Sequence, residues 1–294
     1  MSLFQALLLS VIQGASELFP VSSLGHAVII PALLHWKNAA DILDPDGPFL
    51  PFLVTLHLGT ALALLIYYWS DWKRLIAAFF QQFSVKGAVA KDAKMINLVL
   101  LGTIPTAAIG FVAEKQLREL FASVLAAGIF LVINGCMMIG AEFMRRRAEE
   151  EEIEIYGEVT DRKPMNDLKW SNALWIGLMQ SLALLPGMSR SGATITGGLL
   201  AKLDHADAAR FSFLLATPII LAAGLKEVPK LRHPYEHMAH MGEYSAIGFV
   251  VAGVTAYLSV RFLTKFFETK RMDGFGYYCI VLGLAAVAVT VMHP

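Results

Sequence analysis

This chain is organised around Gln13-Gly-Ala-Ser-Glu-Leu-Phe-Pro-Val-Ser-Ser-Leu-Gly-His26. Glu17 is its only charged residue, because residues 1–16 carry no charge and the next charged residue is Lys37. A later stretch, Leu185-Pro-Gly-Met-Ser-Arg-Ser-Gly-Ala-Thr194, also places a turn, two serines and one charged residue inside an apolar run. Ionisable residues at membrane depth are costly and usually functional. We therefore expect the two stretches to meet and form one site.

The composition is that of a polytopic membrane protein. Of the 294 residues, 56% are hydrophobic and 16% are charged, whereas a soluble domain carries about 25% charged residues. The mean hydropathy is +0.57. A net charge of zero argues against nucleic acid as a partner, since phosphate backbones are bound by an excess of basic residues. We expect one membrane domain over residues 1–294, with membrane lipids around it.

Six uncharged runs are long enough to cross the hydrocarbon core of a membrane, which takes about 20 residues. They are Phe49–Trp69, Met95–Ala113, Leu120–Ala141, Phe211–Leu225, Tyr244–Val260 and Gly274–Met292. Residues 2–35 and 170–201 are also apolar, but the first run is broken at Phe19-Pro20 and the second at Pro186-Gly187. Because each half is too short to span, we expect two helix–turn–helix hairpins that dip into the membrane and return to their own side.

The basic residues predict the orientation. Loops 70–94, 142–169, 202–210 and 261–273 hold 17 Lys and Arg residues, whereas the loops on the other side hold 6. Cytoplasmic loops collect basic residues, so both termini are expected outside, and the two hairpins enter from opposite sides. The sequence thus predicts an all-α membrane protein with six transmembrane helices and two re-entrant hairpins. They form an inverted-topology repeat of residues 1–144 and 170–294, joined by a polar cytoplasmic loop over residues 145–169.

The two turns are expected to form an anion site near the membrane midplane, where inverted repeats with broken helices place their sites. Helices that begin there direct free N–H groups and a positive dipole end inward. Arg190 offers a fork of donors that suits phosphate oxygens, and Gly25 lets the backbone approach a ligand closely. Serines after the two proline turns occupy N-cap positions: Ser22, Ser23, Ser189 and Ser191.

Three further side chains have the chemistry of a phosphate site. Glu17 suits a divalent cation such as Mg²⁺ or Ca²⁺, which usually also takes oxygens from substrate phosphate and water. Gln13 lies four residues earlier, on the same helix face. His26 lies three residues after Ser23, and this spacing suits proton transfer or nucleophilic attack. Thr194 is expected either to touch the substrate or to cap its helix.

At these residues the chain resembles the undecaprenyl-diphosphate phosphatase family, also called the bacitracin-resistance proteins. The family's first motif, (E/Q)-G-x-x-E-(F/L)-x-P-V-S-S-x-G-H, matches residues 13–26, and P-G-x-S-R-S-x-x-T matches residues 186–194. The resemblance implies hydrolysis of undecaprenyl diphosphate, a polyprenyl diphosphate, to its monophosphate and phosphate. That reaction recycles the lipid carrier for cell-wall synthesis and gives bacitracin resistance. The resemblance also implies the bacterial cytoplasmic (inner) membrane, with the site open to the periplasmic side.

The resemblance also assigns roles. It implies that Glu17 and Gln13 bind the divalent cation, although Gln13 cannot ligate as a charged carboxylate. Arg190 would hold the diphosphate, and Ser23 and His26 would do the chemistry. Either Ser23 attacks with His26 as its base, or His26 attacks directly; the sequence leaves this open, as it does the formation of a homodimer. Further substrate contacts are expected from the residues around the turns: Ser22, Gly25, Ser189, Ser191 and Thr194.

Other functions and simpler roles compete with this interpretation. A transporter or flippase for an anionic lipid shares the architecture, but transport needs no nucleophile beside a base. A type-2 phosphatidic acid phosphatase is excluded, because Thr196 stands where that family has His. Glu17 and Arg190 could form only a structural ion pair. Lone polar residues on the spans are expected to hydrogen-bond between helices: His57, Asn97, Asn134 and Gln180.

Two polar segments have no role in the predicted site. His233, His237 and His240 have the spacing of a metal cluster, but they lie in an outer loop beside Pro and Glu, so we expect a solvated surface. The acidic segment 149–167 lies in the predicted cytoplasmic loop, and the sequence indicates no function for it.

Overall fold

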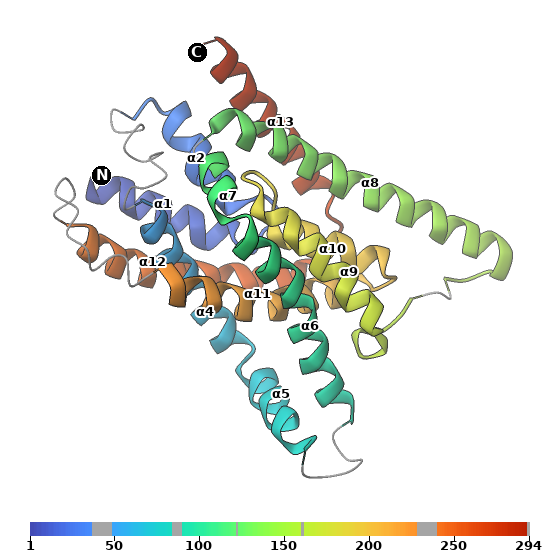
Figure 1. Cartoon of the computed structure of the whole chain (residues 1–294). Helices are drawn as coiled ribbons and strands as arrows, with labels where there is room; N and C mark the ends of the chain where they lie inside the picture. The colour runs from blue at the N-terminus through green and yellow to red at the C-terminus, as the bar shows by residue number, and fades with distance from the viewer. Residues whose placement is uncertain (37–48, 84–89, 122, 160–161, 228–239, 293–294) are drawn as a thin grey trace.

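The computed structural model describes residues 1–36, 49–83, 90–121, 123–159, 162–227 and 240–292, and within these residues it contains helices and no β-strand (Figure 1). The prediction of an all-α chain is therefore confirmed. The elements in chain order are α1 (Leu3–Ser16), α2 (Ser23–Leu33), α4 (Phe49–Tyr67), α5 (Trp69–Gln81), α6 (Ala90–Val112), α7 (Glu114–Phe121), α8 (Val124–Tyr156), η1 (Met165–Asp167), α9 (Trp170–Ser181), η2 (Leu182–Leu184), α10 (Arg190–Leu200), α11 (His205–Glu227), α12 (Met241–Phe266) and α13 (Asp273–Met292).

Six of the described helices are long and apolar enough to cross a membrane: α4, α6, α8, α11, α12 and α13. They correspond one for one to the six predicted spans, so the chain is a multi-pass membrane protein. The third span begins at Val124 rather than Leu120, because the short helix α7 precedes it. Ser123 separates the two helices and caps α8, since its side chain accepts a hydrogen bond from the backbone N–H of Ala126 at 3.1 Å.

Each predicted hairpin is a pair of short helices that pack against one another around a turn: α1 with α2, and α9 with α10. Both second helices begin at a serine N-cap. Ser22 accepts from the N–H of Gly25 and Ser189 from the N–H of Gly192, each at 3.1 Å. Such caps satisfy donors that the first helical turn leaves free. The helix–turn–helix form is as expected, and re-entry into a membrane stays a prediction.

The two halves of the chain contact one another in a reciprocal pattern. Helices α1 and α4 of the first half pack on α12 of the second half. In the same way, helices α9 and α11 of the second half pack on α6 of the first half. The first helix of each hairpin approaches its neighbour closely at a glycine. A Cβ atom on Gly14 would lie 2.4 Å from the Ala252 oxygen, and one on Gly177 would lie 2.3 Å from the Gly102 oxygen. Small residues allow such close packing of membrane helices.

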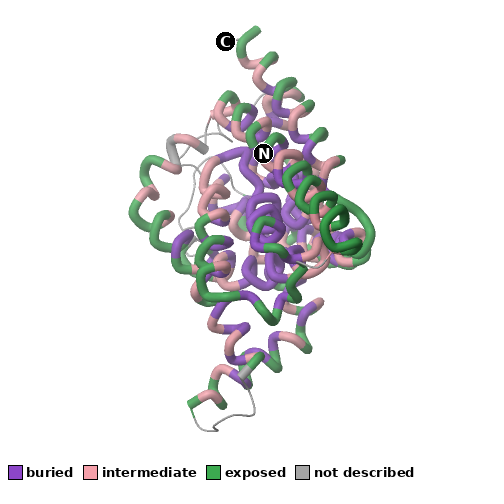
Figure 2. The backbone as a smooth tube through the Cα atoms, turned by 90° about the vertical axis from the view of Figure 1, so that its right-hand side faces the viewer, coloured by how far each residue is buried: buried purple, intermediate pink, exposed green. Residues whose placement is uncertain are grey.

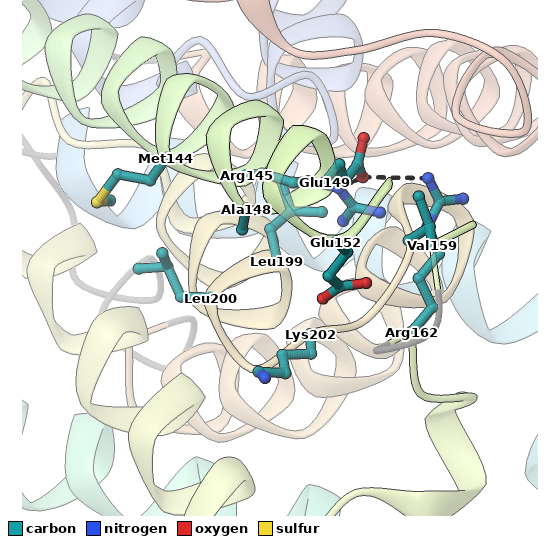
Figure 3. A pocket seen from close by; sticks show the side chains of 10 residues that line it. All are labelled: Met144, Arg145, Ala148, Glu149, Glu152, Val159, Arg162, Leu199, Leu200 and Lys202. Atoms are coloured by element: carbon teal, nitrogen blue, oxygen red, sulfur yellow. Dashed lines mark hydrogen bonds and ion pairs between the residues drawn. The ribbon is translucent and has the colours of Figure 1, made fainter. Parts of the chain in front are cut away.

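Helix α8 extends well past its apolar part, which corrects the prediction of a loop over residues 145–169. Residues 145–156 are helical, and the helix ends at Gly157 with a φ of +80°. Ala, Arg and Glu are strong helix formers, and Arg145 Nε donates to Glu149 at 2.8 Å across one turn. Figure 1 shows this half of α8 projecting beyond the other helices. Figure 3 shows the ion pair between Arg162 and Glu149, with Arg162 Nη2 donating to Glu149 Oε1 at 3.1 Å. These two residues help to line a pocket of about 180 Å³.

The segments that were expected to be cytoplasmic lie together at one end of the molecule. Four contacts join them: Arg210 with Asp71 at 2.8 Å, Lys94 with the Asn166 oxygen at 3.2 Å, Arg145 with the Leu203 oxygen at 2.5 Å, and Arg146 with Asp273. Elsewhere, Lys226 pairs with Glu114, from two segments that were expected on the outer side. These contacts agree with the predicted grouping of the loops.

The buried residues form the centre of the molecule (Figure 2), and many large apolar side chains are exposed at its surface. Ile104, Val250 and Val281 are 59%, 59% and 69% exposed, as expected of surfaces that face lipid rather than water. The interior also contains polar groups, among them Gln13, Glu17, Ser23, His26, Thr194 and Ser212. Most of these come from the two hairpins, so the buried polar groups are concentrated where the hairpins meet the other helices.

Candidate active site

The two turns touch one another in the interior. A Cβ atom on Gly25 would lie 3.1 Å from the Cα atom of Gly187, so the backbones meet where no side chain intervenes. Gly187 has a φ of +93°, and a Cβ atom there would lie 2.1 Å from the Ala127 oxygen of α8. Ser191 Oγ donates to the Phe19 oxygen at 3.0 Å. The prediction that the two stretches meet is therefore correct.

Asn134, in the middle of α8, holds both turns at once. Its Nδ2 donates to the Pro20 oxygen at 3.1 Å, and its Oδ1 accepts from the Ser189 N–H at 3.1 Å. The side chain is fully buried, and an unpaired buried amide would cost about 1–3 kcal/mol. The role expected for this residue, a hydrogen bond between helices, is thus refined: Asn134 fixes one turn relative to the other.

Arg190 and Glu17 form a buried ion pair across the two turns. Arg190 Nε and Nη2 both lie 3.3 Å from Glu17 Oε1, and the side chains are 9% and 5% exposed. Arg190 Nη1 donates to the Ser212 oxygen of α11 at 3.2 Å. The pair brings the only charged residue of each stretch into contact. The guanidinium nitrogens that contact Glu17 Oε1 are also the donors that phosphate oxygens would need.

The other oxygen of Glu17 faces three polar side chains. Oε2 accepts from Ser23 Oγ at 2.6 Å and from Gln13 Nε2 at 2.9 Å. His57 Nε2, from α4, lies 3.2 Å from the same oxygen. The Ser23 hydroxyl is therefore placed to pass its proton to a carboxylate, which is the arrangement of a nucleophile beside a general base.

His26 lies beside this cluster with different partners. Its Nδ1 is 2.7 Å from the Ser22 oxygen, and its Nε2 is 2.7 Å from the hydroxyl of Tyr278 on α13. The two rings also stack, with centroids 5.7 Å apart. Within the described residues no hydrogen bond joins His26 to Ser23. The predicted pairing of Ser23 with His26 as its base is not the one that the structure holds, since the Ser23 hydroxyl points to Glu17 instead.

The remaining predicted residues support the turns. Ser22 and Ser189 are the N-caps of α2 and α10. Thr194 Oγ1 lies 2.8 Å from the Arg190 oxygen and 2.6 Å from Ser212 Oγ, so it fixes the helix turn that carries Arg190. Of the two roles left open for Thr194, the structure does not give it the N-cap position, which Ser189 occupies, and contact with the substrate stays a prediction.

Several site residues were missed by sequence reasoning. Ser212 and Tyr278 lie in long apolar spans with no motif around them, and only tertiary packing brings them to the hairpins. His57 was noticed as a polar residue on a span, but its partner Glu17 could not be identified from spacing. Two other polar residues of this kind do join neighbouring segments as expected: Asn97 donates to Gln82 at 2.9 Å, and Gln180 to Thr106 at 3.3 Å.

The donor set around Glu17 fits a divalent cation. Within the described residues Gln13 Oε1 has no hydrogen-bond partner, and its side chain is only 1% exposed. An unpartnered amide oxygen is the kind of ligand that hard cations take, and the Nε2 of the same amide donates to Glu17. Among the described residues no group of three His, Cys, Asp or Glu could hold a metal. His240 is exposed beside Glu243, whereas His233 and His237 lie outside the described residues.

The chain is similar to known proteins over almost its whole length. Residues 6–285 match the family model described as bacitracin resistance protein BacA. "Undecaprenyl-diphosphatase 2" of Chromobacterium violaceum is 45% identical over 292 residues, which cover 98% of each chain. "Undecaprenyl-diphosphatase" of Granulibacter bethesdensis is 43% identical, covering 98% of this chain and 97% of that one. The protein of the same name from Gluconobacter oxydans is 42% identical, covering 99% and 100%.

Proposed function

Because the chain belongs to the bacitracin resistance protein BacA family, we propose that it hydrolyses undecaprenyl diphosphate to undecaprenyl phosphate and inorganic phosphate. The observation that carries the proposal is the Ser23 hydroxyl, 2.6 Å from a carboxylate oxygen of Glu17 whose other oxygen meets Arg190. A nucleophile (Ser23), a base (Glu17) and a phosphate-binding guanidinium (Arg190) thus converge in one buried cluster. The reaction regenerates the lipid carrier of cell-wall synthesis, and this recycling accounts for bacitracin resistance.

Ser23 is the proposed nucleophile. As its Oγ attacks the terminal phosphorus, Glu17 takes the hydroxyl proton, and the bond from that phosphorus to the bridging oxygen breaks. Undecaprenyl phosphate leaves, and water then hydrolyses the phosphoserine to release inorganic phosphate. His26 is the less favoured nucleophile, because its two ring nitrogens face the Ser22 oxygen and the Tyr278 hydroxyl.

Arg190 and the two helix starts are proposed to hold the diphosphate. Phosphoryl transfer depends mainly on positioning and on neutralising charge. The buried guanidinium would exchange part of its contact with Glu17 for phosphate oxygens. Backbone N–H groups in the first turns of α2 and α10 would add donors, with Gly25 leaving room for close approach. Ser22, Ser189, Ser191 and Thr194 would keep these groups in position.

A divalent cation is the proposed cofactor, held by Glu17 and Gln13. The unpartnered Gln13 Oε1 supports this assignment. When bound, a cation such as Mg²⁺ or Ca²⁺ would neutralise charge on the diphosphate and polarise the phosphorus–oxygen bonds. An amide at position 13 leaves Glu17 as the one anionic ligand of the pair, and the net positive charge of the loaded site would favour an anionic substrate.

The proposed location is the bacterial cytoplasmic membrane, with the site open to the periplasmic side. The uneven distribution of basic residues and the contacts among the expected cytoplasmic segments support this orientation. The reciprocal packing of α1 on α12 and of α9 on α6 supports an inverted repeat with two re-entrant hairpins. A site between the two turns would then lie near the midplane, where the polar head of a lipid could reach it.

The transporter or flippase alternative shares this architecture, but it gives no role to a hydroxyl held on a buried carboxylate. The test is phosphate release from undecaprenyl diphosphate by the purified chain in detergent, with and without a metal chelator, for wild type and Arg190→Ala. We expect release by wild type that the chelator suppresses and that Arg190→Ala lowers by at least about 100-fold. A folded wild type that releases no phosphate with any added metal, yet moves lipid across vesicle membranes, would overturn the enzyme proposal.

A further inference from the structure

His57 holds its ring in the way that metal-binding histidines do. It lies in the middle of α4, and its Nδ1 is 2.7 Å from the Leu53 oxygen. A carbonyl oxygen only accepts, so Nδ1 carries a hydrogen, and Nε2 is the ring nitrogen that remains to bind a proton or a metal. Histidines that bind metals almost always donate their other ring N–H to a carbonyl or carboxylate in this way.

Nε2 of the ring faces the carboxylate of the proposed site. His57 Nε2 lies 3.2 Å from Glu17 Oε2, a separation that either a proton on Nε2 or a shared metal ion can hold. Two ligands that bind one ion at about 2.1–2.2 Å, at angles of roughly 90–110°, lie about 3.0–3.5 Å apart. The observed separation therefore fits neighbouring ligands on one cation without further movement of either side chain.

The Gln13 amide lies beside the same oxygen. Its Nε2 donates to Glu17 Oε2 at 2.9 Å, and within the described residues its buried Oε1 has no partner. Arg190 contacts the other carboxylate oxygen, so a cation would share Oε2 with Ser23, Gln13 and His57. An amide from α1, a carboxylate from the turn that follows it and an imidazole from α4 thus converge.

We propose that His57 Nε2 is a direct ligand of the divalent cation, and that this nitrogen shifts the site toward ions such as Mn²⁺. The inference rests on the proposed function only in placing a cation at Glu17 and Gln13. Mg²⁺ and Ca²⁺ are bound mainly by oxygens, whereas imidazole suits transition metals and carboxylate suits Mn²⁺ as well. His57 therefore determines which cation the site prefers, and Glu17 and Gln13 alone would not discriminate in this way.

The experiment uses Mn²⁺ alone as the probe, on the full-length protein in detergent. Electron paramagnetic resonance counts free Mn²⁺ during a titration, and pulsed measurements detect a nitrogen bound directly to the ion. The variants are His57→Ala and His57→Gln, the second of which keeps an N–H donor toward Glu17 without an imidazole nitrogen. His240→Ala is the matched control, because His240 also lies 3.2 Å from a glutamate, Glu243, but at the exposed surface.

We expect wild type and His240→Ala to bind Mn²⁺ with a nitrogen coupling that changes when histidine is labelled with ¹⁵N. His57→Gln should lose that coupling and at least about tenfold in Mn²⁺ affinity, while Ca²⁺ affinity measured by competition changes much less. If His57→Ala does not fold, the labelling experiment on wild type still tests whether a histidine nitrogen binds the Mn²⁺ ion. A wild type without histidine coupling, or a folded His57→Gln with unchanged coupling, would overturn the assignment.

Parallel assays of phosphate release keep the two proposals separate. If wild type releases phosphate while Mn²⁺ is bound only through oxygens, the proposed phosphatase activity stands and His57 is refuted as a ligand. If His57→Gln abolishes a histidine coupling to Mn²⁺ in a protein that releases no phosphate, His57 stands as a ligand and the proposed phosphatase activity is refuted. If His57 served only as a hydrogen-bond donor to Glu17, His57→Gln would keep the Mn²⁺ affinity of wild type, and that result also contradicts the inference.

Discussion

Ser23 and Glu17 are joined by a hydrogen bond of 2.6 Å between the serine Oγ and the carboxylate Oε2. The bond closes the first turn on itself, because the two residues flank Pro20. It leaves Oε1 to Arg190 of the second turn, so one carboxylate both orients the hydroxyl and joins the two hairpins.

The ion pair between Glu17 and Arg190 contributes to stability as well as to activity. Glu17→Gln leaves a buried guanidinium without its partner, which costs about 3–5 kcal/mol. Arg190→Gln should cost a similar amount, whereas the double variant should regain much of the loss but no activity. Thermal unfolding in detergent measures the first effect and phosphate release the second. Additive losses of stability in the double variant would show that the pair is not coupled.

The geometry of Arg190, and not only its charge, should matter. Lysine keeps the charge but lacks the planar fork that contacts Glu17 Oε1 through two nitrogens at 3.3 Å. We expect Arg190→Lys to fold and to lose roughly 100-fold in kcat, as measured by steady-state phosphate release. A variant within about threefold of wild type would mean that a point charge suffices.

Asn134 should be needed for the relative position of the turns. Asn134→Ala leaves the Ser189 N–H without its partner, at a cost of about 1–3 kcal/mol for a buried group, and leaves the Pro20 oxygen with only the weak Cys279 S–H donor. We expect lower thermal stability together with lower kcat. Asn97→Ala is the control, because Asn97 joins only Gln82 in the half-buried region near α5. Equal effects on kcat in the two variants would contradict a specific role for Asn134.

Gly187 is expected to tolerate no side chain. Its φ of +93° opposes alanine, and so does the Ala127 oxygen, which would lie 2.1 Å from an added Cβ atom. Gly187→Ala should therefore lower the yield of folded protein severely. In Gly140→Ala the new methyl group meets nothing within 4 Å, and a helical Gly-to-Ala change should be neutral or stabilising by up to about 1 kcal/mol. Size-exclusion chromatography and unfolding curves make the comparison, and a well-folded Gly187→Ala would show that the turns are not closely packed.

Much of the fold could be predicted because its signals are local. Six long apolar runs identify spans by length alone, and Pro20 and Pro186 mark turns that divide two further apolar runs into halves too short to span. The meeting of the turns could be predicted because Glu17 and Arg190 are isolated charges in apolar sequence, and each needs a partner. The polar half of α8 was mistaken for a loop, because a helix that projects from the membrane has no apolar face to reveal its period.

The partners of the site residues could not be predicted from spacing. His26 and Ser23 are near neighbours on a helix, yet their side chains point to Tyr278 and Glu17. The choice depends on which helices pack around α2, and no motif surrounds Tyr278 or His57. The sequence therefore indicated which polar groups gather at the two turns, whereas their hydrogen-bond partners required the tertiary structure.

The most direct test of the account is phosphate release from undecaprenyl diphosphate by three proteins in one assay: wild type, Ser23→Ala and Ser10→Ala. Ser10 is a buried serine of α1 whose hydroxyl bonds to the Ala6 oxygen, away from Glu17. We predict activity close to wild type in Ser10→Ala and a loss of at least about 1,000-fold in Ser23→Ala, since the second variant lacks the attacking oxygen. Substantial turnover by a folded Ser23→Ala would exclude Ser23 as the nucleophile and would make His26 the next residue to test.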